Sequence, residues 1–328
     1  MDQPRIVAAG AGAIGCFVGG LLAAAGRDVV LLGRDWLRDE VVARGLTCSD
    51  FDGMEVSAAP EVAVDPGVLA GADVVLVCVK SGASAEIGRL IAQHAPEGAV
   101  VVSLQNGVRN VAVLREVLGG RDVRGGMVGF NVVHRGEGRF HRSTSGEVMI
   151  GAGSGSLGQL LDVPGLEVEE VGDIEAVQRG KLILNLTNAV NALSGMGLRE
   201  MLLDYGWRRV MAVQMGEALK VFKAAGLEVR VPAKAPGWMI PWILRLPTGL
   251  FQRVAAPMLT VDAGAKTSMV ADLEAGRRTE VDEFQGEIVR LGAAHRVAVP
   301  VNACVLQMVE AREGEPGLSP VRPSEVLG

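Results

Sequence analysis

The sequence predicts an α/β protein in which an N-terminal doubly wound parallel sheet is followed by an all-α C-terminal domain. Two observations lead to this prediction. In the first half of the chain, short continuous apolar runs alternate with helical stretches, as in βαβ units whose strands are buried on both faces. After about residue 172, long helical patterns replace this alternation. We therefore expect two domains, at 1–172 and 173–328.

The elements of the first domain are expected in βαβ order. Central parallel strands are expected at 5–10, 28–32, 72–79 and 99–104, with helices between them. The Asp52-Gly53 pair predicts a two-residue hairpin turn. Strands that extend the sheet in antiparallel orientation are expected near 126–134, 138–142 and 146–151. The glycine-rich run 151–158 lacks the terminal Lys-Ser/Thr of a P-loop and is interpreted as a surface connection.

The second domain is expected to be helical throughout. Its helices are expected at 174–193, 199–225, 262–275, 280–294 and 302–313. The most apolar late segment, 237–258, contains Arg245, Arg253 and three prolines, which a membrane-spanning helix would not readily accept. We interpret it as irregular helical structure that covers a cleft or forms a subunit contact, which leaves a homodimer open.

Composition and charge narrow the class of protein. The net charge of -6, without a basic stretch, argues against a nucleic-acid partner, and 49% hydrophobic residues suffice for two buried cores. The four cysteines are scattered without a CxxC pair, and the histidines form no ligand pattern with them, so we expect reduced thiols and no metal site. No basic leader precedes the first apolar run, so we expect a cytoplasmic protein without a membrane partner.

A glycine motif follows the first strand directly and opens a helix. It reads Gly10-x-Gly12-Ala13-Ile14-Gly15, and its position makes it more specific than any lone GxGxxG in a chain with 44 glycines. Gly10 permits a tight turn, Gly12 lets the backbone approach a pyrophosphate, and Gly15 lets the helix pack on the strand. The motif predicts a Rossmann-type dinucleotide site; the alternative is a tight turn without a ligand.

The residues after the second strand indicate which dinucleotide is bound. An acidic residue there would bind the ribose 2′-hydroxyl of NAD, but the chain has Arg34, which suits the 2′-phosphate of NADP. Asp35 lies one residue further on, and Arg34 could instead cap the following helix in solvent. Lys80 and Asn106 end the next two strands, where ligands of open α/β sheets gather, although either could be an ordinary turn residue.

The helix expected at 174–193 carries a polar line on an otherwise apolar surface. Asn185 and Asn188 fall within about 40° of Lys181 on a helical wheel. Asparagine is a poor helix former, so this line is interpreted as facing a wet cleft. The alternative is a solvated edge along which Lys181 extends to water.

Glu280 has two interpretations. Thr279 and Asp282 resemble a capping box, which would place Glu280 in the first helical turn, where its charge favours the helix dipole alone. On the same wheel Glu280 lies close to Phe284 on the apolar side, and a carboxylate aimed at the core needs a partner. Lys181 is that partner if the two helices face each other.

The motifs together resemble those of the ketopantoate reductases, or 2-dehydropantoate 2-reductases. The motifs that carry the resemblance are GAGAIG, VCVK, SLQNG, GKLILN, TSMVADLEAGRRTEVDEFQGEIV and AVPVN, in the expected order over nearly the whole chain. The resemblance implies an NADPH-binding Rossmann domain, a helical domain, and hydride transfer to the C2 carbonyl of ketopantoate.

The resemblance also implies roles for single residues. Lys181 matches the lysine that protonates the developing alkoxide, and Glu280 matches the glutamate that binds the substrate hydroxyl and helps to place that lysine. The other matches are Asn106, Asn185 and Ser268 on the substrate side and Arg34 and Lys80 on the cofactor side.

The chain also departs from the family pattern at two substrate-side positions. Ala189, with Asn188 displaced by one, and Ala265 stand where some members have asparagines. We therefore expect an NADP-dependent oxidoreductase of pantothenate biosynthesis that reduces a small 2-oxo acid, ketopantoate first. The alternatives are a reductase of another 2-oxo acid or an imine, and a non-catalytic NADP-binding sensor.

Overall fold

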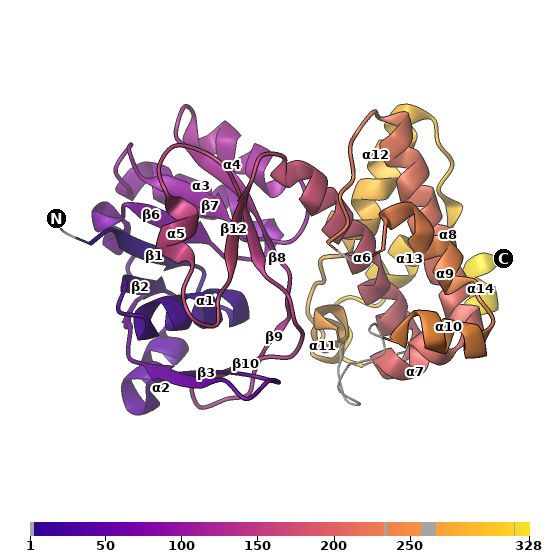
Figure 1. Ribbon diagram of the computed structural model, residues 1–328, viewed down its shortest axis with the longest axis horizontal. Helices are drawn as coiled ribbons and strands as arrows, with labels where there is room; N and C mark the ends of the chain where they lie inside the picture. Colours follow the sequence, from indigo (N-terminus) through magenta and orange to yellow (C-terminus); the bar gives the residue numbers. More distant parts are fainter. Residues whose placement is uncertain (1–2, 233–234, 257–266, 318) are drawn as a thin grey trace. The chain divides into compact units, whose positions relative to one another are not determined.

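The chain forms two compact units, Met1–Glu175 and Ala176–Gly328. The computed structural model in Figure 1 describes residues 3–232, 235–256, 267–317 and 319–328. The division falls just inside helix α6 (Ile174–Ser194), whereas the boundary expected from the sequence, at residue 172, precedes that helix. Each unit is described by itself below.

The N-terminal unit is built on an eight-stranded sheet with the order β12-β11-β8-β7-β6-β1-β2-β5. The strands are β1 (Arg5–Ala9), β2 (Asp28–Leu32), β5 (Glu61–Ala63), β6 (Val74–Val77), β7 (Val100–Ser103), β8 (Val123–Val128), β11 (Val148–Gly151) and β12 (Val168–Val171). Neighbours from β5 to β8 are parallel. The chain proceeds outward from β1 on one side and from β6 on the other, which makes the gap between β1 and β6 the switch point of the sheet.

Both faces of this sheet are covered, as the continuous apolar strands predict. Ile6 and Ala8 enter one core with helices α1 (Ala13–Ala24) and α5 (Leu157–Leu161). Val7 and Ala9 enter the other core, with helices α3 (Ser84–His94) and α4 (Asn110–Leu118). Alternate residues of one strand therefore serve two cores, and the predicted doubly wound α/β class is confirmed.

A second, four-stranded sheet has the order β4-β3-β10-β9. Strands β3 (Leu46–Asp50) and β4 (Glu55–Ala58) form a hairpin around Asp52-Gly53, as expected, and Gly53 takes the positive φ of 96°. The predicted two-residue turn is wrong, because residues 51–54 separate the two strands and the Asp50 N–H donates to the Met54 carbonyl oxygen at 3.0 Å. Strands β9 (Val132–His134) and β10 (Arg139–Arg142) complete this sheet.

The predicted antiparallel extension of the main sheet is therefore correct only for β11. Strand β8 runs parallel to β7, and β10 pairs with β3 in the other sheet. The physical reason lies in one ion pair and one aromatic side chain: Arg142 bonds to Asp50 of β3 at 2.6 Å, and Phe140 is 1% exposed in the core around α1. Turn signals in the sequence located these strands but not their partners.

The C-terminal unit is helical, as predicted. Its elements are α6, α7 (Leu198–Leu203), α8 (Tyr205–Ala224), η3 (Gly237–Met239), α9 (Ile240–Leu244), α10 (Thr248–Val254), α11 (Ser268–Glu274), η5 (Asp282–Gly286), α12 (Glu287–His295), α13 (Pro300–Glu310) and α14 (Pro323–Leu327). The helix expected at 199–225 is broken at Asp204, because the Asp204 carboxylate accepts the Trp207 N–H at 2.8 Å and begins α8. Residues 262–266 of another expected helix lie outside the described residues.

The apolar segment 237–254 is irregular, as expected, and a buried arginine holds it. Arg208 is 0% exposed and donates to the carbonyl oxygens of Leu244 and Leu246 and to Thr248 Oγ1 at 3.3, 2.8 and 2.7 Å. Its guanidinium carbon lies 4.2 Å from the Phe251 ring centre. Within the described parts of the chain, no helix is both long and apolar enough to cross a membrane.

The cysteines of the N-terminal unit are free thiols. Cys16 and Cys48 are 0% and 1% exposed. Burial raises the pKa of Cys48 to about 12 and that of Cys78 to about 12, and it raises the pKa of Cys16 further still. These thiols are therefore neutral at physiological pH.

Candidate active site

The glycine turn between β1 and α1 is built from close backbone contacts. The N–H groups of Gly10 and Ala11 both donate to the carbonyl oxygen of Leu32, at 3.1 and 3.0 Å, which ties the turn to the end of β2. Gly10 has φ 104°, and a Cβ there would lie 2.6 Å from Val79 Cγ1. A Cβ on Gly15 would lie 2.5 Å from the Gly10 carbonyl oxygen. These two positions require glycine for packing alone.

Gly12 differs from its two neighbours in the motif. A Cβ added there would meet nothing within 4 Å, and its φ of −91° suits any residue. The absence of a side chain therefore leaves open space at the N-terminus of α1, where Ala13 and Ile14 belong to the first turn. Helices leave their first N–H groups without intrahelical acceptors, so this space fits the pyrophosphate of a dinucleotide.

Arg34 follows β2 at the start of helix α2 (Asp35–Arg44). Its backbone carbonyl accepts the first helical N–H groups, but its side chain is exposed and makes no capping bond. Asp35 is engaged by Arg38 at 2.9 Å. Among the described residues no carboxylate pairs with Arg34. The charge of Asp35 is thus partly offset, and the Arg34 guanidinium is available to an anion.

The turns after β6 and β7 are joined by buried polar side chains. Ser81 Oγ donates to the Asn106 carbonyl oxygen at 3.1 Å, and Asn110 Nδ2 donates to the same oxygen at 2.5 Å. Gln105 Nε2 donates to the Val79 carbonyl oxygen at 3.0 Å. These bonds hold the turn of Lys80 beside the turn of Asn106, at the carboxyl edge of the sheet where the glycine turn lies.

Sequence reasoning named Lys80 and Asn106 but missed the side chains that position them. Gln105 and Asn110 are 6% and 4% exposed. Gln105 stands in the SLQNG motif, so its place before Asn106 was a usable signal. Asn110 gives no signal in the sequence, because its role depends on a contact with Ser81, 29 residues earlier.

In the C-terminal unit, the three residues of the predicted polar line lie on α6 and differ in burial. Lys181 and Asn188 are half-buried, whereas Asn185 is buried, as are Leu182, Ile183 and Leu186. Burial lowers the pKa of Lys181 to about 8, because the charged amine loses its water. An amine with this pKa gives up a proton far more readily near neutral pH than an ordinary lysine.

The segment 227–231 packs against the first turns of α6. Arg179 Nε donates to the Glu228 carbonyl oxygen at 2.6 Å, and the Arg230 N–H donates to the Ala176 carbonyl oxygen at 2.9 Å. A Cβ on Gly180 would lie 2.1 Å from the Arg230 carbonyl oxygen. The glycine before Lys181 thus permits the close backbone approach in this region of the helix.

The segment that carries Ser268 is attached to the same helix. Thr267, directly before Ser268, donates through its N–H and its Oγ1 to Asn191 Oδ1 at 3.4 and 3.3 Å. Asn191 is 1% exposed, and sequence reasoning did not single it out. Ser268 itself is exposed at the start of α11. Ala265 lies outside the described residues.

Glu280 does not lie in a helical turn, and the predicted capping box with Asp282 is wrong. Glu280 is a half-buried bend residue directly before Val281, where the helix begins. Thr279 Oγ1 accepts the Val281 N–H at 3.2 Å and donates to Glu313 at 2.7 Å. The Asp282 carboxylate instead bonds to Arg290 at 2.6 Å. The helix then begins with a π-helical stretch, η5, rather than the expected α-helix.

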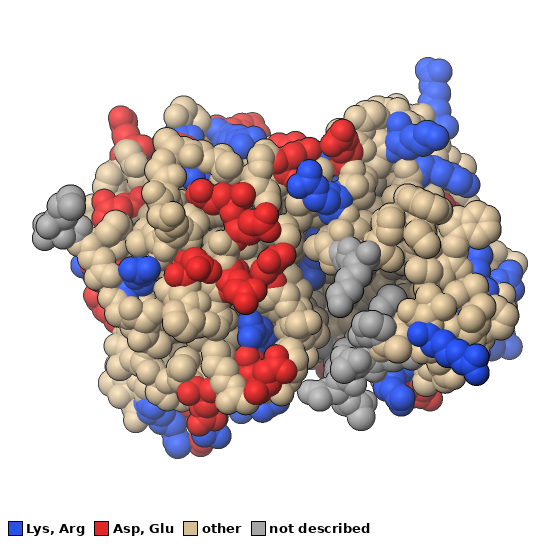
Figure 2. Space-filling model, viewed as in Figure 1, with Lys and Arg blue, Asp and Glu red and all other residues tan. Residues whose placement is uncertain are grey.

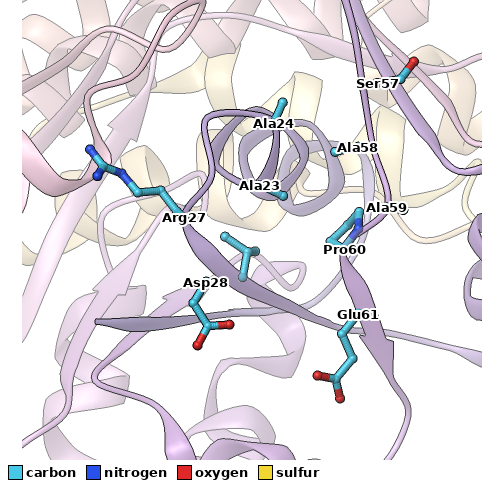
Figure 3. Close-up of a pocket in the computed structure, with 10 residues that line it drawn as sticks. Ala23, Ala24, Arg27, Asp28, Ser57, Ala58, Ala59, Pro60 and Glu61 are labelled. Atoms are coloured by element: carbon cyan, nitrogen blue, oxygen red, sulfur yellow. The ribbon is translucent and has the colours of Figure 1, made fainter. Parts of the chain in front are cut away.

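The depression in Figure 3 lies elsewhere in the N-terminal unit. Its volume is about 420 Å³, and its lining includes Asp28 and Glu61, the first residues of β2 and β5, so it opens at the amino edge of the sheet. The residues predicted to bind a dinucleotide instead follow the carboxyl ends of the strands. Figure 2 shows acidic side chains gathered on the visible face of this unit, which suits a partner other than a polyanion. Among the described residues, no group of three potential ligands could hold a metal ion.

The fold and the glycine turn define a class of protein, the dinucleotide-binding α/β oxidoreductases with a helical second domain. Two family models match the chain: "Ketopantoate reductase PanE/ApbA" over residues 6–155 and "Ketopantoate reductase PanE/ApbA C terminal" over residues 173–313. The chain belongs to the ketopantoate reductase family. Family membership implies a nicotinamide cofactor.

Individual relatives agree with this assignment. The 2-dehydropantoate 2-reductase of Halobacterium salinarum is 29% identical over 317 residues, covering 93% of this chain and 97% of that protein. That of Caulobacter vibrioides is 31% identical over 261 residues, covering 78% of this chain and 83% of that protein. The crystal structure of a PanE/ApbA family ketopantoate reductase from Ralstonia eutropha JMP134 aligns with a TM-score of 0.81 and 30% identity, covering 94% of this chain and 98% of the other.

Proposed function

We propose that this protein catalyses the NADPH-dependent reduction of a small 2-oxo acid, most directly 2-dehydropantoate to pantoate. The observation that carries the proposal is Lys181, a half-buried lysine whose pKa is lowered to about 8 by burial, at the position of the family lysine. Hydride addition to a ketone builds negative charge on the carbonyl oxygen. A positioned ammonium group both stabilises that charge and supplies the proton.

In this proposal the named residues bind the cofactor, bind the substrate or transfer the proton. The N-terminus of α1 at Gly12 and the Arg34 side chain would hold NADPH, which would supply the hydride. Lys181 donates the proton through Nζ, and Glu280 accepts a hydrogen bond from the substrate hydroxyl. Asn106, Asn185, Asn188 and Ser268 are proposed to contact the substrate, with Lys80 and Asn106 near the cofactor.

This proposal leaves open which 2-oxo acid is the substrate. Ala189 is 0% exposed and has no amide to offer, which favours testing 2-oxo acids of other shapes, and imines, beside 2-dehydropantoate. Cofactor binding without any turnover would instead indicate a sensor.

The test is NADPH oxidation, followed by the loss of its near-ultraviolet absorbance, with 2-dehydropantoate and a panel of 2-oxo acids. Lys181→Ala should lower kcat by about 10²- to 10⁴-fold, because a general acid contributes on this scale. NADPH affinity should be unchanged. Turnover at the wild-type rate by Lys181→Ala would contradict the assigned acid, and tight NADPH binding with no turnover of any acid by the wild type would remove the reaction.

The cofactor is tested separately at Arg34. Arg34→Ala removes a charge-assisted contact with a phosphate, typically about 1.5–3 kcal/mol, so the Kd of NADPH should rise about 10- to 100-fold. The Kd of NADH should change little, because NADH lacks that phosphate. Titration calorimetry measures both constants, and equal losses would show that Arg34 does not bind the 2′-phosphate.

A further inference from the structure

Three helices of the C-terminal unit meet at one backbone oxygen. Gln214 of α8 and Gln285 of η5 are both 0% exposed. Each donates through Nε2 to the Leu186 carbonyl oxygen of α6 at 3.0 Å. Gln285 Nε2 also donates to Gln214 Oε1 at 3.3 Å. Buried amides linked in this way fix the separation of the segments that carry them.

The contact lies close in sequence to two residues of the proposed reaction. Leu186 follows Lys181 by five residues on α6, and Gln285 follows Glu280 by five residues. The hydrogen bond from Gln285 to Leu186 therefore connects the segment that carries the carboxylate with the helix that carries the amine. Of the two glutamines, only Gln285 lies on the Glu280 segment.

The π-helical turn between Glu280 and Gln285 is also stabilised by contacts between its own residues and the helix that follows. Arg290 donates to the Asp282 carboxylate at 2.6 Å and to the Asp282 carbonyl oxygen at 2.7 Å. A Cβ on Gly286 would lie 2.4 Å from Asp282 Oδ1 and 3.1 Å from Arg290 Nη1, so the missing side chain leaves room for this ion pair. A π turn accommodates one more residue than an α turn, and regular α-helix would turn Glu280 by about 100° relative to Gln285.

We propose that Gln285 is a positioning residue, which anchors the π turn on the Leu186 carbonyl oxygen and so places the Glu280 carboxylate for the substrate hydroxyl. This inference rests on the proposed function. Gln285 acts through Glu280 and takes no part in hydride or proton transfer. A carboxylate displaced by about 1 Å can cost two orders of magnitude in rate, far more than a lost neutral hydrogen bond costs in stability.

The chain offers a matched control for the test. Gln285→Met and Gln214→Met each remove one amide from the same carbonyl oxygen and keep a side chain of similar length. Both should lower Tm by a similar few degrees, since each loses a buried hydrogen bond. Only Gln285→Met should impair recognition of the substrate hydroxyl.

The readout is the ratio of kcat/KM for 2-dehydropantoate to kcat/KM for 3,3-dimethyl-2-oxobutanoate, the same acid without its hydroxyl. Gln285→Met should lower this ratio at least tenfold, chiefly through the hydroxylated acid, and Gln214→Met should leave it near the wild-type value. Equal losses on both acids in Gln285→Met would show a merely structural role and overturn the inference.

Hydrogen exchange of residues 279–286, measured in the full chain, tests the anchor without turnover. Exchange there should increase in Gln285→Met and remain near the wild-type rate in Gln214→Met. Unchanged exchange in Gln285→Met would overturn the inference even in an active enzyme. Faster exchange in a protein that reduces no 2-oxo acid would uphold the anchor and reject the reaction instead.

Discussion

Lys181 is set apart from a surface lysine by the loss of water around its amine. Burial lowers its pKa to about 8, so the ammonium form that donates a proton persists below this value and disappears above it. Its neighbours Leu182 and Ile183 are buried at 1% and 0% exposure, so they anchor this part of α6 in the core. The chemistry proposed for this residue therefore depends on pH within the range of ordinary assays.

The rate of reduction should follow the protonation of Lys181. With saturating NADPH, kcat/KM should be level below about pH 8 and fall about tenfold per pH unit above it, because only the protonated amine is an acid. The reverse oxidation should rise over the same interval, since it needs the neutral amine. Initial rates in both directions, measured from roughly pH 6 to pH 10, report the two pH dependences.

Lys181→Arg is the matched control, because a guanidinium keeps its proton throughout this interval. Any residual activity of Lys181→Arg should not fall above about pH 8. If kcat/KM of this variant still falls above that pH, the titrating group is not Lys181.

Some residues of the candidate site could be predicted from the sequence, and others could not. Lys181, Asn185 and Asn188 could be named because helical spacing places them on one line, and all three lie on α6. Their burial could not be predicted: Asn185 is buried, whereas the other two are half-buried. Gln285 and Asn191 could not be named, because their role depends on contacts with Leu186 and Thr267, 99 and 76 residues away. No local pattern encodes such a pairing.

At the scale of elements, the glycines of the turn between β1 and α1 differ in what they contact. Gly15 is needed where helix α1 crosses the Gly10 carbonyl oxygen, whereas Gly12 leaves space that no part of the described chain fills. A substitution at each position should therefore fail in a different way.

Gly15→Ala should lower the free energy of unfolding by about 1–3 kcal/mol, because its Cβ would lie 2.5 Å from a backbone oxygen. Gly12→Asp should retain stability, since aspartate is a favoured N-cap residue, but it should abolish NADPH binding by filling the space and repelling phosphate. Denaturant unfolding and NADPH titration of both variants measure the two effects. A stable Gly12→Asp variant that binds NADPH normally would contradict the assigned pyrophosphate site.

The elements were predictable where their signal was local. The strands at 28–32 and around 5–9 follow from continuous apolar runs, and the hairpin at Asp52-Gly53 follows from its turn residues. The partner of β10 was not predictable, because it depends on contacts between distant residues, such as the ion pair of Arg142 with Asp50. The parallel pairing of β8 with β7 was also missed. The π turn at 282–286 was missed because a helical wheel assumes a constant pitch.

For the whole molecule, the fold of the N-terminal unit follows from a repeating sequence pattern, whereas that of the helical unit does not. The N-terminal unit repeats a rhythm of apolar strands and helices that defines its class, and its sheet has the expected parallel centre. The helical unit is held by buried polar contacts, among them Arg208 with the irregular segment 237–254 and the two glutamines with Leu186. Such contacts determine the shape of a helical domain without leaving a repeating pattern.

The buried thiols of the N-terminal unit have a practical consequence. Cys16 and Cys48 have raised pKa values inside the core around α1, so the thiolate that electrophiles attack is scarce while the sheet is closed. Alkylating reagents reach these sulfurs only when the sheet opens. The rate at which these two cysteines are alkylated, followed by mass spectrometry, therefore reports how often this core opens. No added probe is required.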